Sequence, residues 1–252
     1  MAKKCIFGPI LSRRLGSSLG INLLPYKTCS LNCIYCECGV TTNLTTERKE
    51  YIPTQEVIES LKKYAASSQF RSAPPYCITF AGWGEPTLHS ALGEIAHFIK
   101  KLFPEQKLVL ITNGTLFAFY EELSEEVKEM DIIIPSLDAA SPQALQAIDQ
   151  PHPRITLNSY IESLIKLRKH FPGEIWLEVF IVEGINDSER ELNFLKEKIA
   201  LVSPHRVQIN ALDRNPAREG VKSPPFYKLE EIASFLGGET ILPSPRKSKV
   251  VV

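Results

Sequence analysis

Hydrophobic residues occur along this chain in two patterns: short continuous runs, and longer stretches in which they recur every three or four positions. Short apolar runs are typical of strands covered on both faces, whereas the wider spacing places side chains on one side of a helix. In the stretch 54–66, for example, Val57, Ile58 and Leu61 fall on one side. The pattern predicts strands at 19–24, 76–81, 107–112, 132–137, 174–182 and 206–212, and helices at 54–66, 90–103, 115–129, 158–171, 187–201 and 226–236.

Strands that alternate with helices in this way predict an α/β fold with a parallel sheet. Right-handed crossovers then lead either to an open doubly wound sheet or to a partial barrel. We expect one core domain over residues 1–212. Residues 213–252 are expected to form a C-terminal appendage: a loop at 213–225, a helix at 226–236 that Gly237-Gly238 ends, and a polar, basic tail.

Composition limits the class of protein. Of the 252 residues, 44% are hydrophobic and 23% are charged, which argues against a disordered chain or a coiled coil. We expect no membrane span, because the sequence holds no apolar run of about 18 residues. A net charge of zero argues against coating of nucleic acid by bulk electrostatics. However, residues 1–50 and 204–252 are basic and 51–203 are acidic, so an anionic substrate stays open.

Arg13-Arg14 invites comparison with a twin-arginine export signal. The residues that follow include Gly16, Gly20 and Pro25, so the sustained apolar segment of such a signal is missing. We therefore expect a cytoplasmic protein whose thiols stay reduced.

The cysteines are concentrated: four of the six lie between Cys29 and Cys38. Crowded thiols in a reducing compartment indicate a metal centre rather than a disulfide framework. Zinc would need four ligands, with Cys38 as the fourth. Cys29, Cys33 and Cys36 would instead hold three irons of an iron–sulfur cluster and leave one iron open to a small chelator. The residue chemistry favours iron–sulfur over zinc and leaves both open.

Residues suited to ligand binding follow one strand after another. Ligands of parallel α/β folds lie at the carboxyl ends of the strands. The segments placed there are the loop that holds Cys29 to Cys38 (the cysteine loop), Gly82-Trp83-Gly84-Glu85-Pro86, Thr112-Asn113-Gly114, Ser136 with Asp138, Glu183–Asp187, and Asn210 with the residues 213–216.

The spacing Cys29-x3-Cys33-x2-Cys36, with Tyr35 before the third cysteine, resembles the signature of the radical S-adenosylmethionine (SAM) superfamily. The segment 82–86 is similar to that superfamily's Gly-Gly-Glu-Pro motif, with Trp83 in a glycine position. The resemblance implies a partial (β/α)6 barrel with a short C-terminal cap. It also implies a [4Fe–4S] cluster on the three cysteines, whose remaining iron is chelated by SAM.

The resemblance further implies which residues contact SAM. Backbone at Gly82, Trp83, Gly84 and Glu85 would receive the amino group of SAM. Thr112, Asn113 and Ser136 would approach its carboxylate or ribose, and Tyr35 and the strand around Asn210 would flank its adenine. A reduced flavodoxin or ferredoxin is the implied electron donor.

Further segments resemble a narrower group, the Fe–S oxidoreductases related to wyosine-type tRNA synthases. They are residues 7–16, Lys27-Thr28-Cys29, Gln150–Pro153, Glu183–Asp187 and 208–214. The archaeal tRNA enzymes carry three more upstream cysteines for a second cluster, whereas only Cys5 lies upstream here.

Three functional hypotheses follow. The first is a radical SAM enzyme whose 5′-deoxyadenosyl radical abstracts hydrogen from an RNA or tRNA substrate. The second is a radical SAM activase or maturase that acts on a protein or peptide, and the third is a zinc-binding protein without catalysis. Arg246–Lys249 is either a flexible tail or a contact for an RNA backbone. Cys38 is expected to be an ordinary loop cysteine and Cys77 a core residue.

Overall fold

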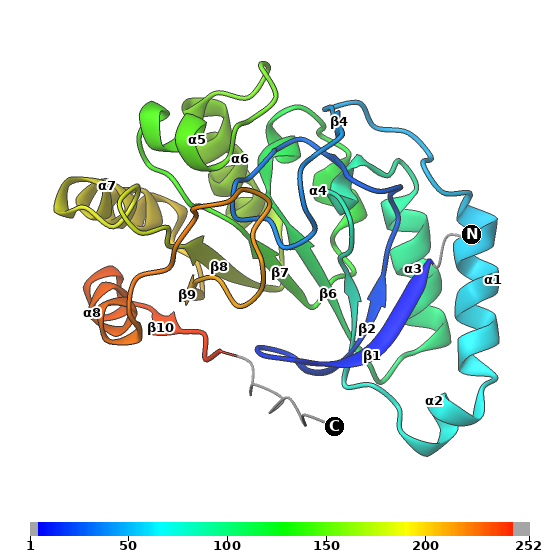
Figure 1. Ribbon diagram of the computed structural model, residues 1–252. Coiled ribbons are helices and arrows are strands. Elements are labelled where there is room, and N and C mark those ends of the chain that lie inside the picture. Colours follow the sequence, from blue (N-terminus) through cyan, green and yellow to red (C-terminus); the bar gives the residue numbers. More distant parts are fainter. Residues whose placement is uncertain (1–4, 244–252) are drawn as a thin grey trace.

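A computed structural model describes residues 5–243. Its centre is a curved sheet of eight strands in the order β1-β2-β5-β6-β7-β8-β9-β10 (Figure 1). The strands are β1 Ile6–Ser12, β2 Gly16–Ile21, β5 Cys77–Phe80, β6 Lys107–Thr112, β7 Ile132–Pro135, β8 Glu174–Phe180, β9 Arg206–Asn210 and β10 Glu239–Thr240. Two short strands, β3 Thr28–Cys29 and β4 Asn43–Leu44, form a separate parallel pair.

Strands β2 to β10 are parallel to their neighbours in the sheet, and only β1 runs antiparallel, against β2. Each predicted strand is found in this sheet, and helices connect the parallel strands along the chain. The α/β fold predicted from the sequence is therefore confirmed, with the curvature of a partial (β/α)6 barrel.

Helices cover the outer face of the sheet in two groups (Figure 1). The longer ones are α1 Thr54–Ala65, α3 Leu92–Leu102, α6 Leu157–His170, α7 Glu189–Val202 and α8 Phe226–Leu236; the shorter ones are α2 Ser68–Ser72, α4 Leu123–Glu126, α5 Pro142–Ile148 and the 3-10 turns η1 Pro86–Leu88 and η2 Thr115–Ala118. The apolar sides of α1 and α3 pack on β2, β5 and β6, and those of α6, α7 and α8 pack on β8 and β9.

Helix α8 has the bounds predicted for it and shares the second core. Leu229, Ile232 and Leu236 are buried in the same cluster as Ile209 of β9. The helix ends at Gly237, whose positive φ of 73° suits a glycine. The expected division into residues 1–212 and 213–252 stays a prediction.

The turn between β1 and β2 enters the concave side of the sheet. Leu15 is 3% exposed there. It packs with inward-facing residues of four strands, which are Cys77, Val109, Ile132, Ile134 and Trp176. Cys77 is therefore a core residue, as expected. Next to Leu15, Arg14 forms a buried ion pair with Glu178 of β8, which links the hairpin to the far side of the barrel.

The predicted helix at 115–129 is wrong. The chain instead forms η2, a turn and the short helix α4. Asn113 Oδ1 accepts hydrogen bonds from the Thr115 amide (3.0 Å) and hydroxyl (2.8 Å), which tightens the first turn. Farther along, Arg48 pairs with Glu122 (3.0 Å) and Glu126 (2.6 Å) and fixes the acidic segment from outside. A local turn at Asn113 and a contact with distant Arg48 together override the helical spacing.

Other differences concern short elements. Strand β1 and the helices α2 and α5 lie outside the predicted ones, and the predicted strand at 19–24 is β2, which ends at Ile21. Asn22 ends it, because its side-chain amide turns back to donate to the Leu24 carbonyl (2.8 Å).

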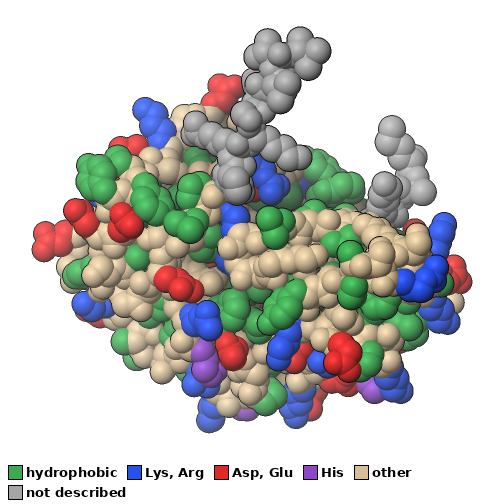
Figure 2. Space-filling view, turned by 90° about the horizontal axis from the view of Figure 1, so that it is seen from below, with side chains coloured by type: hydrophobic (Ala, Val, Ile, Leu, Met, Phe, Trp, Pro, Cys, Tyr) green, Lys and Arg blue, Asp and Glu red, His purple; other side chains and the backbone are tan. Residues whose placement is uncertain are grey.

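Among the described residues, no helix combines the length and the apolar character needed to cross a membrane. On the face seen from below, Lys and Arg are interspersed with Asp and Glu, so this face is of mixed charge (Figure 2). The basic segment Arg246–Lys249 lies outside the described residues.

Candidate functional site

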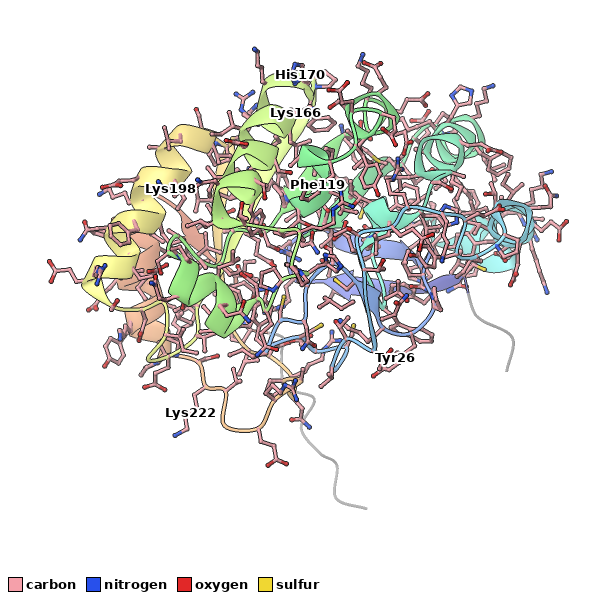
Figure 3. All side chains as sticks on the ribbon, turned by 90° about the horizontal axis from the view of Figure 1, so that it is seen from above. Tyr26, Phe119, Lys166, His170, Lys198 and Lys222 are labelled. Atoms are coloured by element: carbon pink, nitrogen blue, oxygen red, sulfur yellow. The ribbon has the colours of Figure 1, made fainter. Side chains whose placement is uncertain are left out.

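A cavity of about 140 Å³ lies at the carboxyl ends of the parallel strands. The cysteine loop crosses this end of the barrel (Figure 3). Nine of the residues predicted from the sequence line the cavity: Cys29, Cys33, Cys36, Gly82, Gly84, Glu85, Thr112, Asn113 and Ser136. Lys27, Leu31 and Ile111 complete the lining. The structure thus brings together residues that are more than 100 positions apart in the chain.

Each of the three cysteines has a polar neighbour. Lys27 Nζ donates a hydrogen bond to Cys36 Sγ (3.1 Å). Asn113 Nδ2 lies 3.6 Å from Cys29 Sγ, and Cys33 Sγ lies 3.4 Å from Asp149 Oδ1. All three thiols are partly buried within one loop.

The environments of the thiols differ. Burial raises the pKa of Cys29 to about 11, and burial together with nearby Asp149 raises the pKa of Cys33 well above its ordinary value. The neighbouring Cys38 thiol, followed by the charge of Lys27, lowers the pKa of Cys36 to about 5. Binding of a metal requires the thiolate form of each ligand cysteine.

The residues 148–152, which begin at the last residue of α5, hold the cysteine loop by its backbone. The Asn32 amide donates to the Asp149 carbonyl and the Ile34 amide to the Ile148 carbonyl, each at 2.9 Å. The His152 amide returns a bond of 2.9 Å to the Ser30 carbonyl. The segment Gln150–Pro153 entered the sequence argument only through a resemblance. Its contact with the cysteine loop joins segments too distant in the chain to predict from local pattern.

The loop after β5 requires both of its glycines. Gly82 has a φ of +136°, and a Cβ there would lie 2.4 Å from Asn22 Oδ1. A Cβ on Gly84 would lie 1.9 Å from the Thr28 carbonyl oxygen. This close approach lets the Glu85 amide donate to that same oxygen (3.1 Å). The loop is thereby joined to the start of the cysteine loop.

Trp83 differs from its two glycine neighbours because it does not line the cavity. Its amide donates to Asn22 Oδ1 (3.1 Å), while its ring is 44% exposed and meets the ring of Tyr26 edge-on at 5.8 Å. A large side chain therefore fits at this position without filling the cavity.

Glu85 is 2% exposed, and its carboxylate joins two strand ends. Oε1 accepts bonds from the Thr87 amide (3.1 Å), the Thr87 hydroxyl (2.6 Å) and the Thr112 hydroxyl (2.5 Å). Oε2 accepts from the Asn113 amide (2.7 Å). Burial raises the pKa of Glu85, and these bonds oppose that rise. Its side chain thus braces the loops after β5 and β6 against each other.

Two further predicted residues lie away from the cavity lining. The Tyr35 ring stacks on Phe180 of β8 with centroids 3.8 Å apart, and its hydroxyl donates to buried Asp138. The Asn210 side chain donates to Glu178 Oε2 (3.1 Å). Their predicted contacts with adenine stay predictions.

The loop after β9 also touches the cysteine loop. The Arg218 amide donates to the Ile34 carbonyl (3.0 Å), and Arg214 Nε lies 3.4 Å from a carboxylate oxygen of Glu37. The sequence placed residues 213–216 at this end of the sheet, but the contacts that Arg214 and Arg218 make with the cysteine loop were not predicted, because local composition does not indicate a partner.

The donor set fits a cluster with three protein ligands. Among residues 5–243, no three Cys, His, Asp or Glu side chains converge on the position of a single metal ion. Cysteines that each bind a different iron need no such convergence, and Cys29, Cys33 and Cys36 line one cavity beside the positive charge of Lys27. Cys38 donates to the Gly82 carbonyl (3.4 Å) and lies outside the cavity lining.

Sequence comparison relates the chain to curated proteins of several organisms. It is 39% identical over 232 residues to a protein named GTPase Obg of Brachyspira hyodysenteriae, a match that covers 92% of this chain and 33% of that protein. It is 35% identical over 206 residues to a UPF0026 protein of Synechocystis, covering 81% and 74%. A UPF0026 protein of Helicobacter pylori is 33% identical over 210 residues, covering 83% and 66%. The chain therefore spans only a third of the Brachyspira protein and two thirds of the Helicobacter protein.

Solved structures share the fold. A radical SAM methyltransferase from Sphaerobacter thermophilus superposes with a TM-score of 0.68 at 16% identity, covering 88% of this chain and 64% of that one. TYW1 with a lysine–pyruvate adduct bound gives 0.61 at 16%, covering 87% and 72%. Streptococcus suis SuiB bound to precursor peptide SuiA gives 0.64 at 13%, covering 89% and 47%.

The family profile described as Radical SAM superfamily matches residues 23–194, which include the cysteine loop and the strand ends around the cavity. The chain therefore belongs to the radical SAM superfamily, whose cofactors are a [4Fe–4S] cluster and SAM.

Proposed function

We propose that this protein is a radical SAM enzyme in which Cys29, Cys33 and Cys36 each bind one iron of the cluster. The observation that supports this most strongly is the single cavity lined by the three cysteines, both glycines of the β5 loop, Thr112, Asn113 and Ser136. When bound, the cluster and SAM supply a 5′-deoxyadenosyl radical that abstracts hydrogen from the substrate.

The chain's own residues hold and orient these groups. Gly82 and Gly84 leave the backbone after β5 free of side chains, as close approach of the SAM amino group requires. Glu85 fixes Thr112 and the Asn113 amide, which places their polar atoms for the SAM carboxylate or ribose.

We propose RNA as the substrate class. The loop after β9, which contacts the cysteine loop, exposes Arg214, Arg218 and Lys222. At another edge of the same end of the barrel, Tyr26 and Trp83 expose 56% and 44% of their surfaces (Figure 3). Exposed cations with exposed aromatic rings are the groups that bind phosphates and stack on unpaired bases.

A peptide or protein is the second candidate substrate. SuiB shares the fold and its structure was solved with a precursor peptide. The same open end of the barrel would receive such a chain, and competition between the two kinds of substrate separates the candidates.

Anaerobic reconstitution with iron and sulfide tests the proposed chemistry. We expect the wild-type protein to take up iron and sulfide and, on reduction with SAM, to release 5′-deoxyadenosine. Cys33→Ala is expected to lose both, whereas Cys38→Ala removes a neighbour of Cys36 but no cavity-lining thiol and is expected to keep the cluster and the turnover. Turnover retained by Cys33→Ala, or absence of iron uptake and 5′-deoxyadenosine in the wild type, contradicts the proposal.

Binding to a tRNA transcript and to a short oligonucleotide tests the substrate class. We expect tighter binding of the longer RNA and weaker binding as salt rises. Replacing Arg214, Arg218 and Lys222 by Ala should weaken binding, while the same change at three exposed lysines of α1 and α3, Lys62, Lys63 and Lys101, should not. An affinity that is absent or independent of RNA length argues for the peptide.

A further inference from the structure

Lys27 is a buried lysine whose ammonium lies among thiols. The residue is 3% exposed, and its Nζ donates to Cys36 Sγ at 3.1 Å. The charged forms of Cys29 and Cys33 also favour the protonated form of Lys27, and both cysteines line the same cavity as Lys27. Within residues 5–243, no carboxylate comes within ion-pair distance of this ammonium.

The backbone around Lys27 is fixed by hydrogen bonds, so its side chain starts from a fixed point beside the cavity. The Lys27 carbonyl accepts bonds from the Thr42 (3.1 Å) and Asn43 (3.0 Å) amides. The next residue, Thr28, begins β3, which pairs with β4. The Thr28 amide also bonds back to the Pro25 carbonyl (3.3 Å) and closes a turn beneath Lys27.

A buried ammonium is costly unless an opposite charge compensates it. In this site the compensating groups are the cysteine sulfurs, which are thiolates when they bind iron. One-electron reduction of the cluster adds negative charge to a place that already holds three thiolates. A fixed positive charge in a partly buried site stabilises that added charge more than it would in water.

On the basis of the proposed cluster ligands, we propose that the ammonium of Lys27 raises the reduction potential of the cluster and thereby favours its acceptance of an electron. Lys27 acts through Cys36 and is a positioning residue in this role. The electron comes from the external reductant, and Lys27 keeps its proton.

The experiment compares Lys27→Met, Lys27→Arg and Lys49→Met after anaerobic reconstitution. Methionine keeps the length of the side chain and removes the charge, and arginine keeps the charge. Lys49 is a matched control because it is an exposed lysine paired with Glu47 at 3.2 Å. Dithionite sets the potential, and electron paramagnetic resonance measures the fraction of the cluster that is reduced. The samples contain no SAM and have equal iron and sulfide contents.

At the wild-type midpoint potential, we expect the ratio of reduced to oxidised cluster in Lys27→Met to fall at least tenfold, which is ~59 mV for one electron. Lys27→Arg and Lys49→Met are expected to stay near the wild-type value. An unchanged potential in Lys27→Met at full iron content overturns the inference.

Failure of the underlying function gives a different result. If the wild-type protein takes up no cluster, the proposed cysteine ligands are wrong. If Lys27→Met does not fold, Lys27→Gln replaces it in the same titration, with the same expected shift.

Discussion

The β1–β2 turn and the cysteine loop both reach the inside of the barrel, but different forces hold them there. At the turn, Leu15 packs into a cluster of inward-facing apolar side chains and Arg14 pairs with Glu178. The cysteine loop buries Leu31 and Ile34, and it is held in addition by backbone hydrogen bonds, from the 148–152 segment, from Arg218 and from the loop after β5.

The difference shows how the two segments divide structure from chemistry. Apolar packing at the turn needs no free polar atom and contributes to stability directly. The cysteine loop keeps its three ligand cysteines only partly buried at the cavity, so hydrogen bonds made by its backbone add to the packing of Leu31 and Ile34 in fixing its position. We therefore expect changes at the turn to act on stability, and changes around the loop to act on cluster binding.

Arg14→Met should have the largest effect on stability. It leaves Glu178 buried with Asn210 as a remaining hydrogen-bond donor (3.1 Å). The free energy of unfolding, measured in urea, should fall by about 3–5 kcal/mol. Iron uptake by the folded fraction should stay at the wild-type level.

The double variant Arg14→Met/Glu178→Gln removes the unpaired charge and should recover part of this loss. Lys128→Met breaks an exposed ion pair with Glu125 and is expected to cost less than about 1 kcal/mol. Equal costs for Arg14→Met and Lys128→Met would show that the buried pair does not secure the turn.

Gly84→Ala should reduce cluster binding more than it reduces stability. The new Cβ would lie 1.9 Å from the Thr28 carbonyl oxygen, so the start of the cysteine loop must move. We expect a loss of about 1–3 kcal/mol in stability together with a much larger loss of bound iron and sulfide. Gly220→Ala replaces a glycine of positive φ in open space, where the new Cβ meets no neighbour, and should keep its iron. Full iron content in Gly84→Ala would contradict the proposed role of this approach.

A smaller loss of stability is expected when the pH is lowered, and it comes from His89 at the end of the barrel that carries the candidate site. His89 is fully buried; its Nδ1 accepts from the Ala91 amide (3.2 Å), so Nε2 carries the proton donated to the Ile52 carbonyl (2.8 Å). Burial lowers the pKa of His89 below its ordinary value of 6.5. The stability it contributes is complete above pH 6.5 and is lost as the pH falls through its lowered pKa, with a slope of at most about 1.4 kcal/mol per pH unit.

Urea unfolding at pH 7.5, 6.5 and 5.5 measures this slope. His89→Gln should reduce the pH dependence between these values, whereas His97→Gln, at an exposed histidine paired with Glu129, should leave it unchanged. A slope in His89→Gln equal to that of the wild type would contradict the assignment.

Much of the fold was predictable because the strands and long helices have strong local patterns. The stretch 107–112 is apolar and β-branched and forms β6 as expected, and helix 226–236 has the predicted bounds. The stretch 115–129 has helical spacing too, yet a local turn made by the Asn113 side chain and ion pairs with distant Arg48 override it; hydrophobic spacing contains neither. Strand β1 was missed because its ladder depends on β2 as a partner.

The candidate site, too, has some features that the sequence predicted and others that it did not. Nine of the residues expected to contact the cluster or SAM line one cavity, since each follows a parallel strand and such strands end at one edge. Lys27 and Asp149 were not singled out. Their relevance depends on distances of 3.1 and 3.4 Å to cysteine sulfurs, which spacing along the chain does not reveal.

By itself, the sequence determined the order of strands and helices, the superfamily and the cysteines expected to hold iron, because these depend on residue type and short spacing. The tertiary structure alone decided what surrounds them: a buried ammonium beside Cys36, a carboxylate beside Cys33 and a C-terminal loop bonded to Ile34. These neighbours come from distant parts of the chain and meet only when the barrel forms.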